Sequence, residues 1–522
     1  MSKFNKTTTR TAVTSPIKTE PTPTGHTHEG APGYTRDAKS ELFLLAVSNM
    51  VGESTFYESG DARDNRYRDL IHTVAVADLE WTTEFLSWLR SGANMRSASL
   101  VGGLEAAKAL KDAGIAGGRK IVDSVLQRAD EPGEALAYWM GAYGRAIPKP
   151  IKRGVADAVI RLYTEYTLLK YDAASKGFRF GDVVDLTHPA TDKPWQGELF
   201  RHALDRRHGR DNPVNLDMVN ANAALRRDAV DDLDVLLDAD RLRAAGMTWE
   251  DALSLAGPDV DKAGLWEAMI PSMGYMALLR NLRNFDQAGV SDAVADKVAQ
   301  RLADPEQVTK SRQLPFRFLS AHLATTSLRW GHALEKALDQ AVANVPALGG
   351  RTLVLVDTSA SMGSRVSDRS EVSAAQAAAL FGAVLAKRGE HVDLHGFANS
   401  TFRHDFPAGA SVLRTIDKFI ARIGEVGHGT QIADAVRSTY DGHDRVVILS
   451  DMQTMTGWNV GNVGDQAPAH IPIYGWNLVG YRYGAIPSGT GNRHEFGGFS
   501  DAAFRLIPLL EAGRDADWPW VN

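Results

Sequence analysis

The chain has 522 residues, 44% apolar and 8% aromatic, which is enough to bury the cores of two or more domains. It contains no cysteine, so disulfides and thiolate-bound metals are excluded, and this suits a cytoplasmic protein. The net charge of −6 argues against unspecific nucleic-acid binding by the whole surface. Residues 1–10 lack an apolar signal core and no apolar run could span a bilayer, so we expect no membrane segment.

The first two thirds of the chain divide into a tail and a helical region. Residues 1–35 carry Thr, Pro, Lys, Gly and His with few large aliphatic side chains, a composition that predicts a disordered tail. Residues 36–346 show helical periodicity with short Gly and Pro interruptions. The predicted helices cover 41–48, 71–90, 98–113, 118–128, 133–143, 151–171, 195–205, 216–224, 233–243, 248–255, 265–270, 275–285, 291–302, 316–326 and 331–345. Such a run of paired helices predicts an α-solenoid with HEAT-like stacking.

The pattern changes after Gly350, and residues 349–522 form a second predicted domain. Short apolar strands now alternate with helices, which predicts a parallel, doubly wound α/β sheet. The predicted strands are 352–356, 391–397, 446–450 and 471–476, and the predicted helices are 370–388, 411–421, 430–440 and 501–511. The fold class is therefore multidomain, with a helical solenoid or ring followed by an α/β domain.

Five polar residues follow the predicted strands and loops of this second domain. Asp357 ends one buried strand and begins the motif Asp-x-Ser-x-Ser, and Asp451 ends another strand. Because ligand sites lie at the carboxyl ends of parallel strands, the two carboxylates should meet there. With Ser359, Ser361 and Thr430 they offer only hard oxygen donors, which suit Mg²⁺. The pattern resembles the metal-ion-dependent adhesion site (MIDAS) of von Willebrand factor A domains.

Two other readings of these residues are open. Asp357 alone could be a helix cap, although a cap does not explain a second strand that ends in Asp. Phosphoryl-transfer enzymes of the haloacid type also place an Asp after a first strand, but they need a second Asp where this chain has Ser359. No nucleophile, base and orienting group converge here, so we expect the metal to bind rather than catalyse, and we expect no enzyme activity.

A basic window interrupts the helical region. Between Arg145 and Arg210 thirteen Lys and Arg stand against eight Asp and Glu, so the window carries +5 and the rest of the chain −11. Aromatic residues are interleaved with these charges, among them Tyr163, Tyr166, Tyr171, Phe178, Phe180 and Trp195. Cations with stacking platforms are typical of single-strand nucleic-acid binding, and a solvated helix face over core aromatics is the alternative.

Local stretches of the helical region resemble the Ro ribonucleoprotein (TROVE-domain) family, of bacterial or phage type. They are Tyr143-Gly144-Arg145-Ala146, Lys170-Tyr171, the segment 178–189, Ala277 to Asn284 and Leu314-Pro315-Phe316. A von Willebrand A domain with a MIDAS follows the TROVE domain in that family. The resemblance covers residues 36 to 515 in order.

The resemblance implies a ring of helical repeats that binds RNA. Small noncoding Y RNAs would bind an outer basic face, and single-stranded 3′ ends of misfolded RNAs would enter the central hole. Lys170 and His188 match residues implicated in RNA contact, and Lys149, Lys152 and Arg153 lie on the same segment. Arg280 and Arg283 share one face of a predicted helix and are candidates for lining the hole. An exoribonuclease partner and a monomeric state are also implied.

One position departs from the family pattern. The family often has a basic residue four positions after the one matched by Lys170, where this chain has Ala174. Lys176 is the candidate substitute. Two rival functions remain: a metal-dependent adhesion or scaffold protein without an RNA role, and a metal-dependent phosphatase or nuclease.

Overall fold

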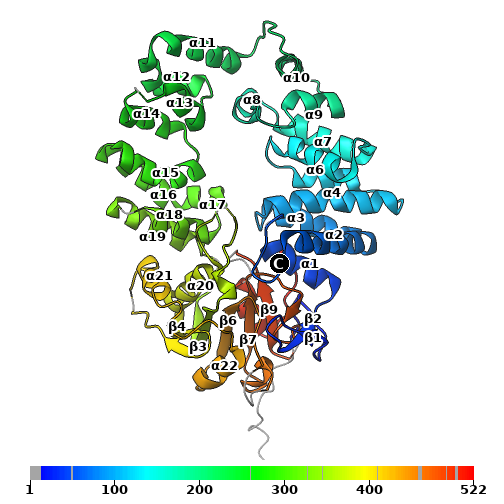
Figure 1. Ribbon diagram of the computed structural model, residues 1–522, viewed down its shortest axis with the longest axis vertical. Helices are drawn as coiled ribbons and strands as arrows, with labels where there is room; N and C mark the ends of the chain where they lie inside the picture. The colour runs from blue at the N-terminus through cyan, green and yellow to red at the C-terminus, as the bar shows by residue number, and fades with distance from the viewer. Residues whose placement is uncertain are drawn as a thin grey trace, which may run out of the picture.

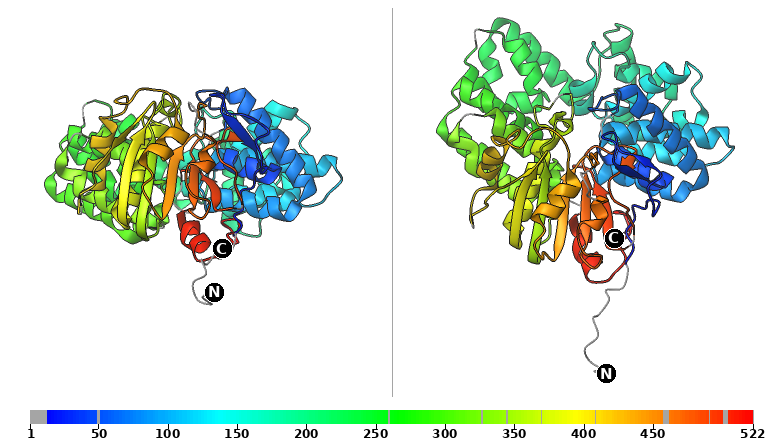
Figure 2. Two further views of the ribbon diagram at one scale, coloured as in Figure 1. Left: turned by 90° about the horizontal axis from the view of Figure 1, so that it is seen from below. Right: turned by 60° about the horizontal axis from the view of Figure 1, so that its bottom comes forward.

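The computed structural model describes residues 13–48, 51–258, 260–325, 327–343, 345–368, 370–407, 409–456, 461–489, 491–499 and 504–521. Two helical arms rise from an α/β domain and meet again at their far ends, so that the chain forms a ring (Figure 1). Seen from below, the sheet lies across the base between the two arms (Figure 2). No helix in the described part of the chain combines the length and apolar character needed to cross a bilayer.

The first arm contains ten helices among the described residues. They are α1 (Ala38–Ser48), α2 (Gly60–Ala77), α3 (Leu79–Ser91), α4 (Arg96–Asp112), α5 (Gly118–Val125), α6 (Glu131–Tyr143), α7 (Lys149–Leu162), α8 (Glu165–Tyr171), α9 (Phe180–Thr187) and α10 (Pro194–Arg207). Two predicted long helices are each split in two. Asp78 accepts the Trp81 N–H at 3.0 Å and starts α3, and Thr164 forms a capping box that starts α8.

The second arm begins with α11 (Asp217–Asp231) and has its own core. It continues through α12 (Ala239–Ala244), α13 (Trp249–Ala256), α14 (Lys262–Met269), α15 (Tyr275–Ala288), α16 (Asp292–Ala303), α17 (Pro305–Ser311), α18 (Pro315–Ala324) and α19 (Gly331–Ala341). Short 3₁₀ turns lie at Leu233–Leu237, Ile270–Ser272 and Leu328–Trp330. The apolar core of the first arm extends to Val219, and the core that continues into the α/β domain includes Leu225. The two cores therefore divide within α11.

A carboxylate links the far ends of the two arms. Glu165, at the start of α8, accepts the backbone N–H groups of Met218 and Val219 at 2.8 and 3.1 Å. These groups lie in the first turn of α11, where N–H groups lack helical partners. Glu165 thus caps the first helix of the second arm from the last helices of the first.

A six-stranded sheet forms the base of the ring. Its strands are β3 (Leu348–Asp357), β4 (Gly389–Phe397), β5 (Thr401–Arg403), β6 (Arg445–Ser450), β7 (Ile473–Asn477) and β9 (Arg493–Gly497), in the order β5-β4-β3-β6-β7-β9. Five strands are parallel and β5 is antiparallel to β4, so the predicted parallel sheet has one antiparallel edge. The helices are α20 (Ala374–Arg388), α21 (Val412–Ile420), α22 (Ile432–Thr439) and α23 (Leu506–Glu511). Residues 501–503 of the predicted last helix lie outside the described residues.

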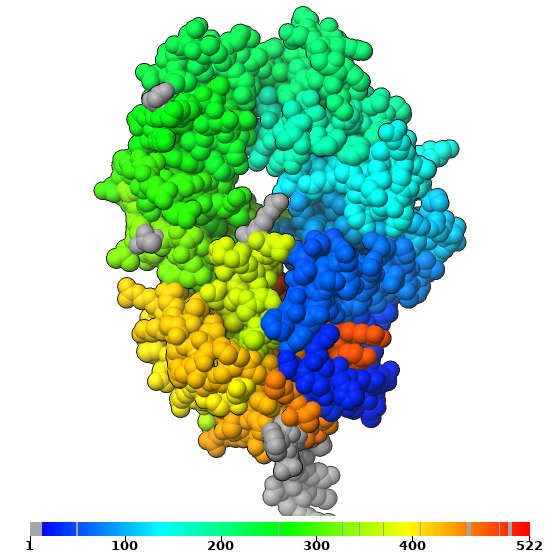
Figure 3. All heavy atoms as spheres, in the orientation of Figure 1, coloured from blue at the N-terminus to red at the C-terminus, as the bar shows by residue number. Residues whose placement is uncertain are grey.

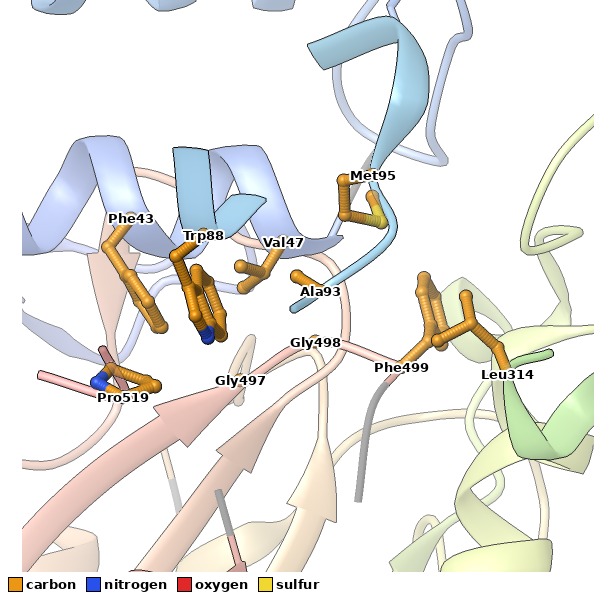
Figure 4. A pocket seen from close by; sticks show the side chains of 10 residues that line it. All are labelled: Phe43, Val47, Trp88, Ala93, Met95, Leu314, Gly497, Gly498, Phe499 and Pro519. Atoms are coloured by element: carbon orange, nitrogen blue, oxygen red, sulfur yellow. The ribbon is translucent and has the colours of Figure 1, made fainter. Parts of the chain in front are cut away.

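Both arms meet the α/β domain around an apolar pocket at the base of the ring. Phe43 of α1, Trp88 of α3 and Leu314 before α18 line it together with Phe499 and Pro519 (Figure 4). Next to it the Asn94 side chain donates to the Arg312 carbonyl at 2.9 Å, from the first arm to the second. The base of the ring is therefore closed by side chains from both arms and the sheet.

The prediction of a disordered tail is wrong for residues 13–35, and residues 1–12 lie outside the described part of the chain. Strands β1 (Gly25–His26), β2 (Pro32–Thr35) and β8 (Tyr483–Gly484) form a small antiparallel sheet. Ile17 and Tyr34 are 1% and 4% exposed. The prediction from composition was wrong because a few apolar side chains, together with backbone hydrogen bonds to the α/β domain, are enough to order residues 13–35. We call these residues the N-terminal arm.

Candidate metal centre and basic surfaces

The five predicted metal ligands come together at the carboxyl edge of the sheet. Strands β3 and β6 are parallel neighbours, with Val356 opposite Leu449, so Asp357 lies beside Ser450 and Asp451 is the next residue, directly after β6. The loop after Asp357 is tied to its neighbours: the Thr358 N–H donates to the Phe397 carbonyl at 2.8 Å, and the Ala360 N–H donates to the His428 carbonyl at 2.9 Å. The second bond brings the motif to the loop that carries Thr430.

All five side chains are buried. Asp357 and Asp451 are 0% exposed, and Ser359, Ser361 and Thr430 are 3%, 2% and 1% exposed. Burial first, and then the charge of Asp357, raise the pKa of the Asp451 carboxyl; burial also raises the pKa of Asp357. Two carboxylates in one dry site need a counter-charge before both can ionise.

The donor geometry fits a small divalent cation. The hydroxyl oxygens of Ser359 and Ser361 are 3.1 Å apart, close to the separation of about 3 Å expected for adjacent ligands of Mg²⁺ with metal–oxygen distances near 2.1 Å. The Asp451 Oδ2 atom is buried without a hydrogen-bond partner. Among the described residues no three His, Cys, Asp or Glu side chains are spaced for a metal, so any ion here depends on the hydroxyls. The donor set suits Mg²⁺ and not a softer metal.

Ser450 is a member of this site that the sequence prediction missed. Its hydroxyl donates to Asp357 Oδ2 at 2.6 Å and accepts the Met452 N–H at 3.0 Å. It thereby holds the Asp357 carboxylate from the neighbouring strand, as second-layer partners of metal ligands do. Its position directly before Asp451 was the available signal.

The basic window is an exposed surface whose charges fall into two groups. Six of its cations form ion pairs with carboxylates: Arg161, Arg179, Arg201, Arg206, Arg207 and Arg210. The other seven have no ion pair among the described residues, and we call them the unpaired cations: Arg145, Lys149, Lys152, Arg153, Lys170, Lys176 and Lys193. Four of the predicted RNA-binding residues belong to this second group.

Three unpaired cations lie on the first two turns of α7. Lys149 and Arg153 are exposed and Lys152 is half-buried, and the first turn contains no acidic residue. The N-terminus of a helix is the positive end of its dipole, where Lys and Arg are unfavourable unless an anion balances them. Backbone N–H groups and cations together make this helix end suited to phosphate.

Lys170 and His188 are also exposed, on α8 and at the end of α9. The Lys170 ammonium lies 5.6 and 5.2 Å from the ring centres of Tyr166 and Tyr171. His188 has φ 49, a left-handed conformation that ends α9 and turns the chain outward. The structure therefore leaves both side chains accessible from solvent.

Only part of the aromatic set can act as stacking platforms. Tyr166 and Trp195 are each 42% exposed. Tyr163 and Phe180 are 1% and 3% exposed and stack on each other with ring centres 3.7 Å apart, so they are core residues. Their interpretation as nucleic-acid platforms is wrong, because apolar periodicity in the sequence does not separate a core ring from a surface ring.

The second basic surface lies on the second arm. Arg280 and Arg283 are exposed residues of α15. Burial first, then the nearby charge of Arg280, lower the pKa of Arg317 on α18, whereas Glu53 raises it. Glu53 belongs to the first arm, between α1 and α2, so charges from both arms act on Arg317. The space-filling view shows an opening between the arms (Figure 3). Arg317 is a further residue that the sequence prediction missed.

Parts of this chain match a known domain and known proteins. Residues 240–331 match the model of the TROVE domain. The chain is 47% identical over 77 residues to telomerase protein component 1 of Mus musculus, and 33% identical over 118 residues to the RNA-binding protein RO60 of Caenorhabditis elegans. These matches cover 14% and 20% of this chain, but only 3% and 18% of the two relatives.

The fold as a whole matches a solved structure. The Ro (Rsr) protein of Deinococcus radiodurans superposes with a TM-score of 0.61, covering 91% of this chain and all of that protein, at 18% identity. The helical arms and the mixed sheet therefore form a Ro-like fold. Residues 240–331 thus resemble a TROVE domain, and the chain as a whole shares the fold of a Ro protein.

Proposed function

We propose that this protein binds RNA through its two basic surfaces and takes part in RNA quality control or processing without being an enzyme. The observation that carries this proposal is the group of seven unpaired cations on the first arm. A cation with an internal carboxylate partner must give up that partner to bind phosphate, whereas an unpaired one is free to do so. The TROVE match and the RNA-binding relative support the same class of ligand.

The two surfaces suit different parts of one RNA. On α7 to α10, cations with exposed Tyr166 and Trp195 would hold a folded RNA, such as a small noncoding Y-like RNA, through its backbone and loops. Arg280, Arg283 and Arg317 would hold the single-stranded 3′ end of a misfolded RNA at the ring opening. An exoribonuclease that receives this 3′ end is the proposed protein partner, and we propose a cytoplasmic monomer.

The α/β domain would be a von Willebrand A domain with a MIDAS. Asp357, Ser359, Ser361, Thr430 and Asp451 would hold Mg²⁺ there. When bound, Mg²⁺ supplies a positive charge with exchangeable water positions that an acidic oxygen can occupy. The buried, partnerless Asp451 Oδ2 supports this assignment.

A binding assay tests the proposed function. Structured RNA with a single-stranded 3′ tail should bind the full chain with an affinity that falls steeply with salt, and the same RNA with a blunt end should bind more weakly. No binding of either RNA at low salt would exclude the proposal. It would leave the second candidate, a metal-dependent adhesion or scaffold protein, which the buried metal centre favours.

A further inference from the structure

The N-terminal arm places a tight loop, residues 27–31, against the candidate metal centre. The Thr27 N–H donates to the Ala31 carbonyl at 2.9 Å, and the Gly30 N–H donates to the Thr27 carbonyl at 3.0 Å. Gly30 has φ 92, which a residue with a Cβ rarely adopts, so the loop turns sharply at this position. Glu29 precedes it at the tip of the turn.

The loop is fixed to the segment that follows Asp451. The Thr27 hydroxyl donates to the Thr454 carbonyl at 2.7 Å, and the His28 N–H donates to the Gln453 side chain at 2.8 Å. Thr454 in turn donates from its hydroxyl to the carbonyl of Thr430 at 3.0 Å. The loop is thus joined, through one residue, to the segments that supply two of the five metal ligands.

The Glu29 carboxylate accepts a hydrogen bond from the Tyr57 hydroxyl. Gln453, whose side chain accepts the His28 N–H, donates its own N–H to Asp451 Oδ1 at 3.0 Å, so the residue next to Glu29 is connected to a metal ligand through one residue. His28 stacks on the Tyr57 ring, with ring centres 4.8 Å apart, and so fixes the position of this hydroxyl.

Mg²⁺ takes six oxygen ligands in near-octahedral geometry, and the centre offers five side chains from the α/β domain. Asp451 Oδ2, buried and without a partner, shows that the site as it stands lacks one positive or donating group. Among the described residues no third carboxylate is grouped with the two aspartates, so Glu29 must turn away from Tyr57 to reach a cation placed there.

We propose that Glu29 of the chain's own N-terminal arm supplies the acidic group at the outward position of the metal centre, so that the ion binds the arm to the α/β domain. The inference rests on the metal centre proposed above. Glu29 now bonds Tyr57, so its carboxylate turns from that hydroxyl toward the ion when the ion binds. The site takes its acidic ligand from within the chain, and the ion links residues 27–31 to the carboxyl edge of the sheet.

Two measurements on the full chain test this inference: Mg²⁺ binding by titration calorimetry, and amide hydrogen exchange of residues 24–35 with and without Mg²⁺. Glu29→Gln should weaken Mg²⁺ binding about 10-fold or more, as the loss of a ligand or of its close partner does. Mg²⁺ should slow exchange in the arm of the wild-type chain and not in that of Glu29→Gln. Glu20→Gln is the matched control, because Glu20 is an exposed carboxylate of the same arm.

The outcomes separate this inference from the rest of the account. Unchanged or tighter Mg²⁺ binding by Glu29→Gln would overturn the inference. Amide hydrogen exchange of residues 24–35 that responds to Mg²⁺ equally in the wild type and in Glu29→Gln would overturn it as well. If the wild-type chain binds no Mg²⁺, the metal centre itself is refuted together with this inference. RNA binding by Glu29→Gln should equal that of the wild type, so a failure of the RNA proposal would appear in a different assay. Circular dichroism verifies that the variant is folded.

Discussion

At the scale of single residues, the candidate metal centre depends on two fully buried aspartates, Asp357 and Asp451, and on the hydroxyl groups beside them. Asp357 and Asp451 were predictable because each follows a short apolar strand, and parallel strands bring such ends together. Glu29 and Tyr57 were not, since neither is near the motif in sequence. Strand β9 was also missed: its residues are polar, yet Arg493 and Glu495 are buried because each is paired, Glu495 with Arg36 at 2.6 Å.

Asp357→Asn should abolish Mg²⁺ binding while RNA binding by the helical arms largely survives. The amide keeps the size of the side chain but removes the charge that the cation needs. Calorimetry with Mg²⁺ and a filter-binding assay with tailed RNA measure the two properties separately. Equal loss of both would contradict this account and would make the ion a structural requirement of the whole ring.

His494 should make folding sensitive to mild acid. This residue of β9 is 1% exposed, and burial, followed by the charge of Arg493, lowers its pKa from 6.5 to about 4. In the unfolded chain the His494 imidazole is therefore protonated below about pH 6.5, whereas in the folded chain it is protonated only below about pH 4. The free energy of unfolding is unaffected by this group above pH 6.5 and falls as the pH is lowered from about 6.5 to about 4, by at most about 3 kcal/mol.

Chemical denaturation at pH 7 and pH 5 measures this effect. His494→Gln should reduce the difference in unfolding free energy between the two pH values, whatever its effect at pH 7. His391→Gln, at an exposed site on β4, is the control and should leave the difference unchanged. An equal difference in wild type and His494→Gln would show that other groups control the acid response.

At the scale of elements, most helices of the two arms were predictable in their order along the chain, but not the points where one helix ends and the next begins. Apolar periodicity continues across Asp78 and Thr164, so the sequence reads as single helices where capping side chains start new ones. Helix α9 was missed because its eight residues fall in a stretch that looks extended near Pro189. The division of the two cores within α11 depends on tertiary packing and has no sequence signal.

The cations at the N-terminus of α7 should make the largest electrostatic contribution to RNA binding. Replacing Lys149, Lys152 and Arg153 together by Glu removes three cations without internal partners. The plot of log affinity against log salt concentration should then be less steep by about 2–3 units, since each phosphate contact contributes roughly 0.7–0.9 to its slope. Arg119→Glu is the control on the neighbouring helix, because Arg119 already pairs with Asp157. An unchanged slope in the triple variant would place the RNA elsewhere.

Glu165 should stabilise the junction between the arms. Glu165→Ala leaves two N–H groups at the start of α11 without their acceptor, and we expect a loss of about 1–2 kcal/mol in unfolding free energy. Glu306→Ala, which breaks an exposed pair with Lys310, should cost less than about 0.5 kcal/mol. Denaturant unfolding compares them, and equal losses would refute the capping role.

At the scale of the whole molecule, the ring brings together segments that are far apart in the chain. The opening lies between the two helical arms (Figure 3), and the base joins the N-terminal arm, the sheet and both helical arms. The sequence predicted a solenoid and a separate α/β domain. It could not predict the ordered N-terminal arm, whose few apolar contacts matter only because the sheet edge is there to receive them.

The central claim is that one RNA contacts both basic surfaces, with its single-stranded 3′ end in the ring. The most direct test is photocrosslinking of a structured RNA with a reactive nucleotide in the 3′ tail and another in the folded part, followed by peptide identification. The account predicts tail crosslinks to α15 and α18, near Arg280 and Arg317, and crosslinks of the folded part to α7 through α10. Crosslinks of the tail to the outer face alone, or none to either surface, would contradict it.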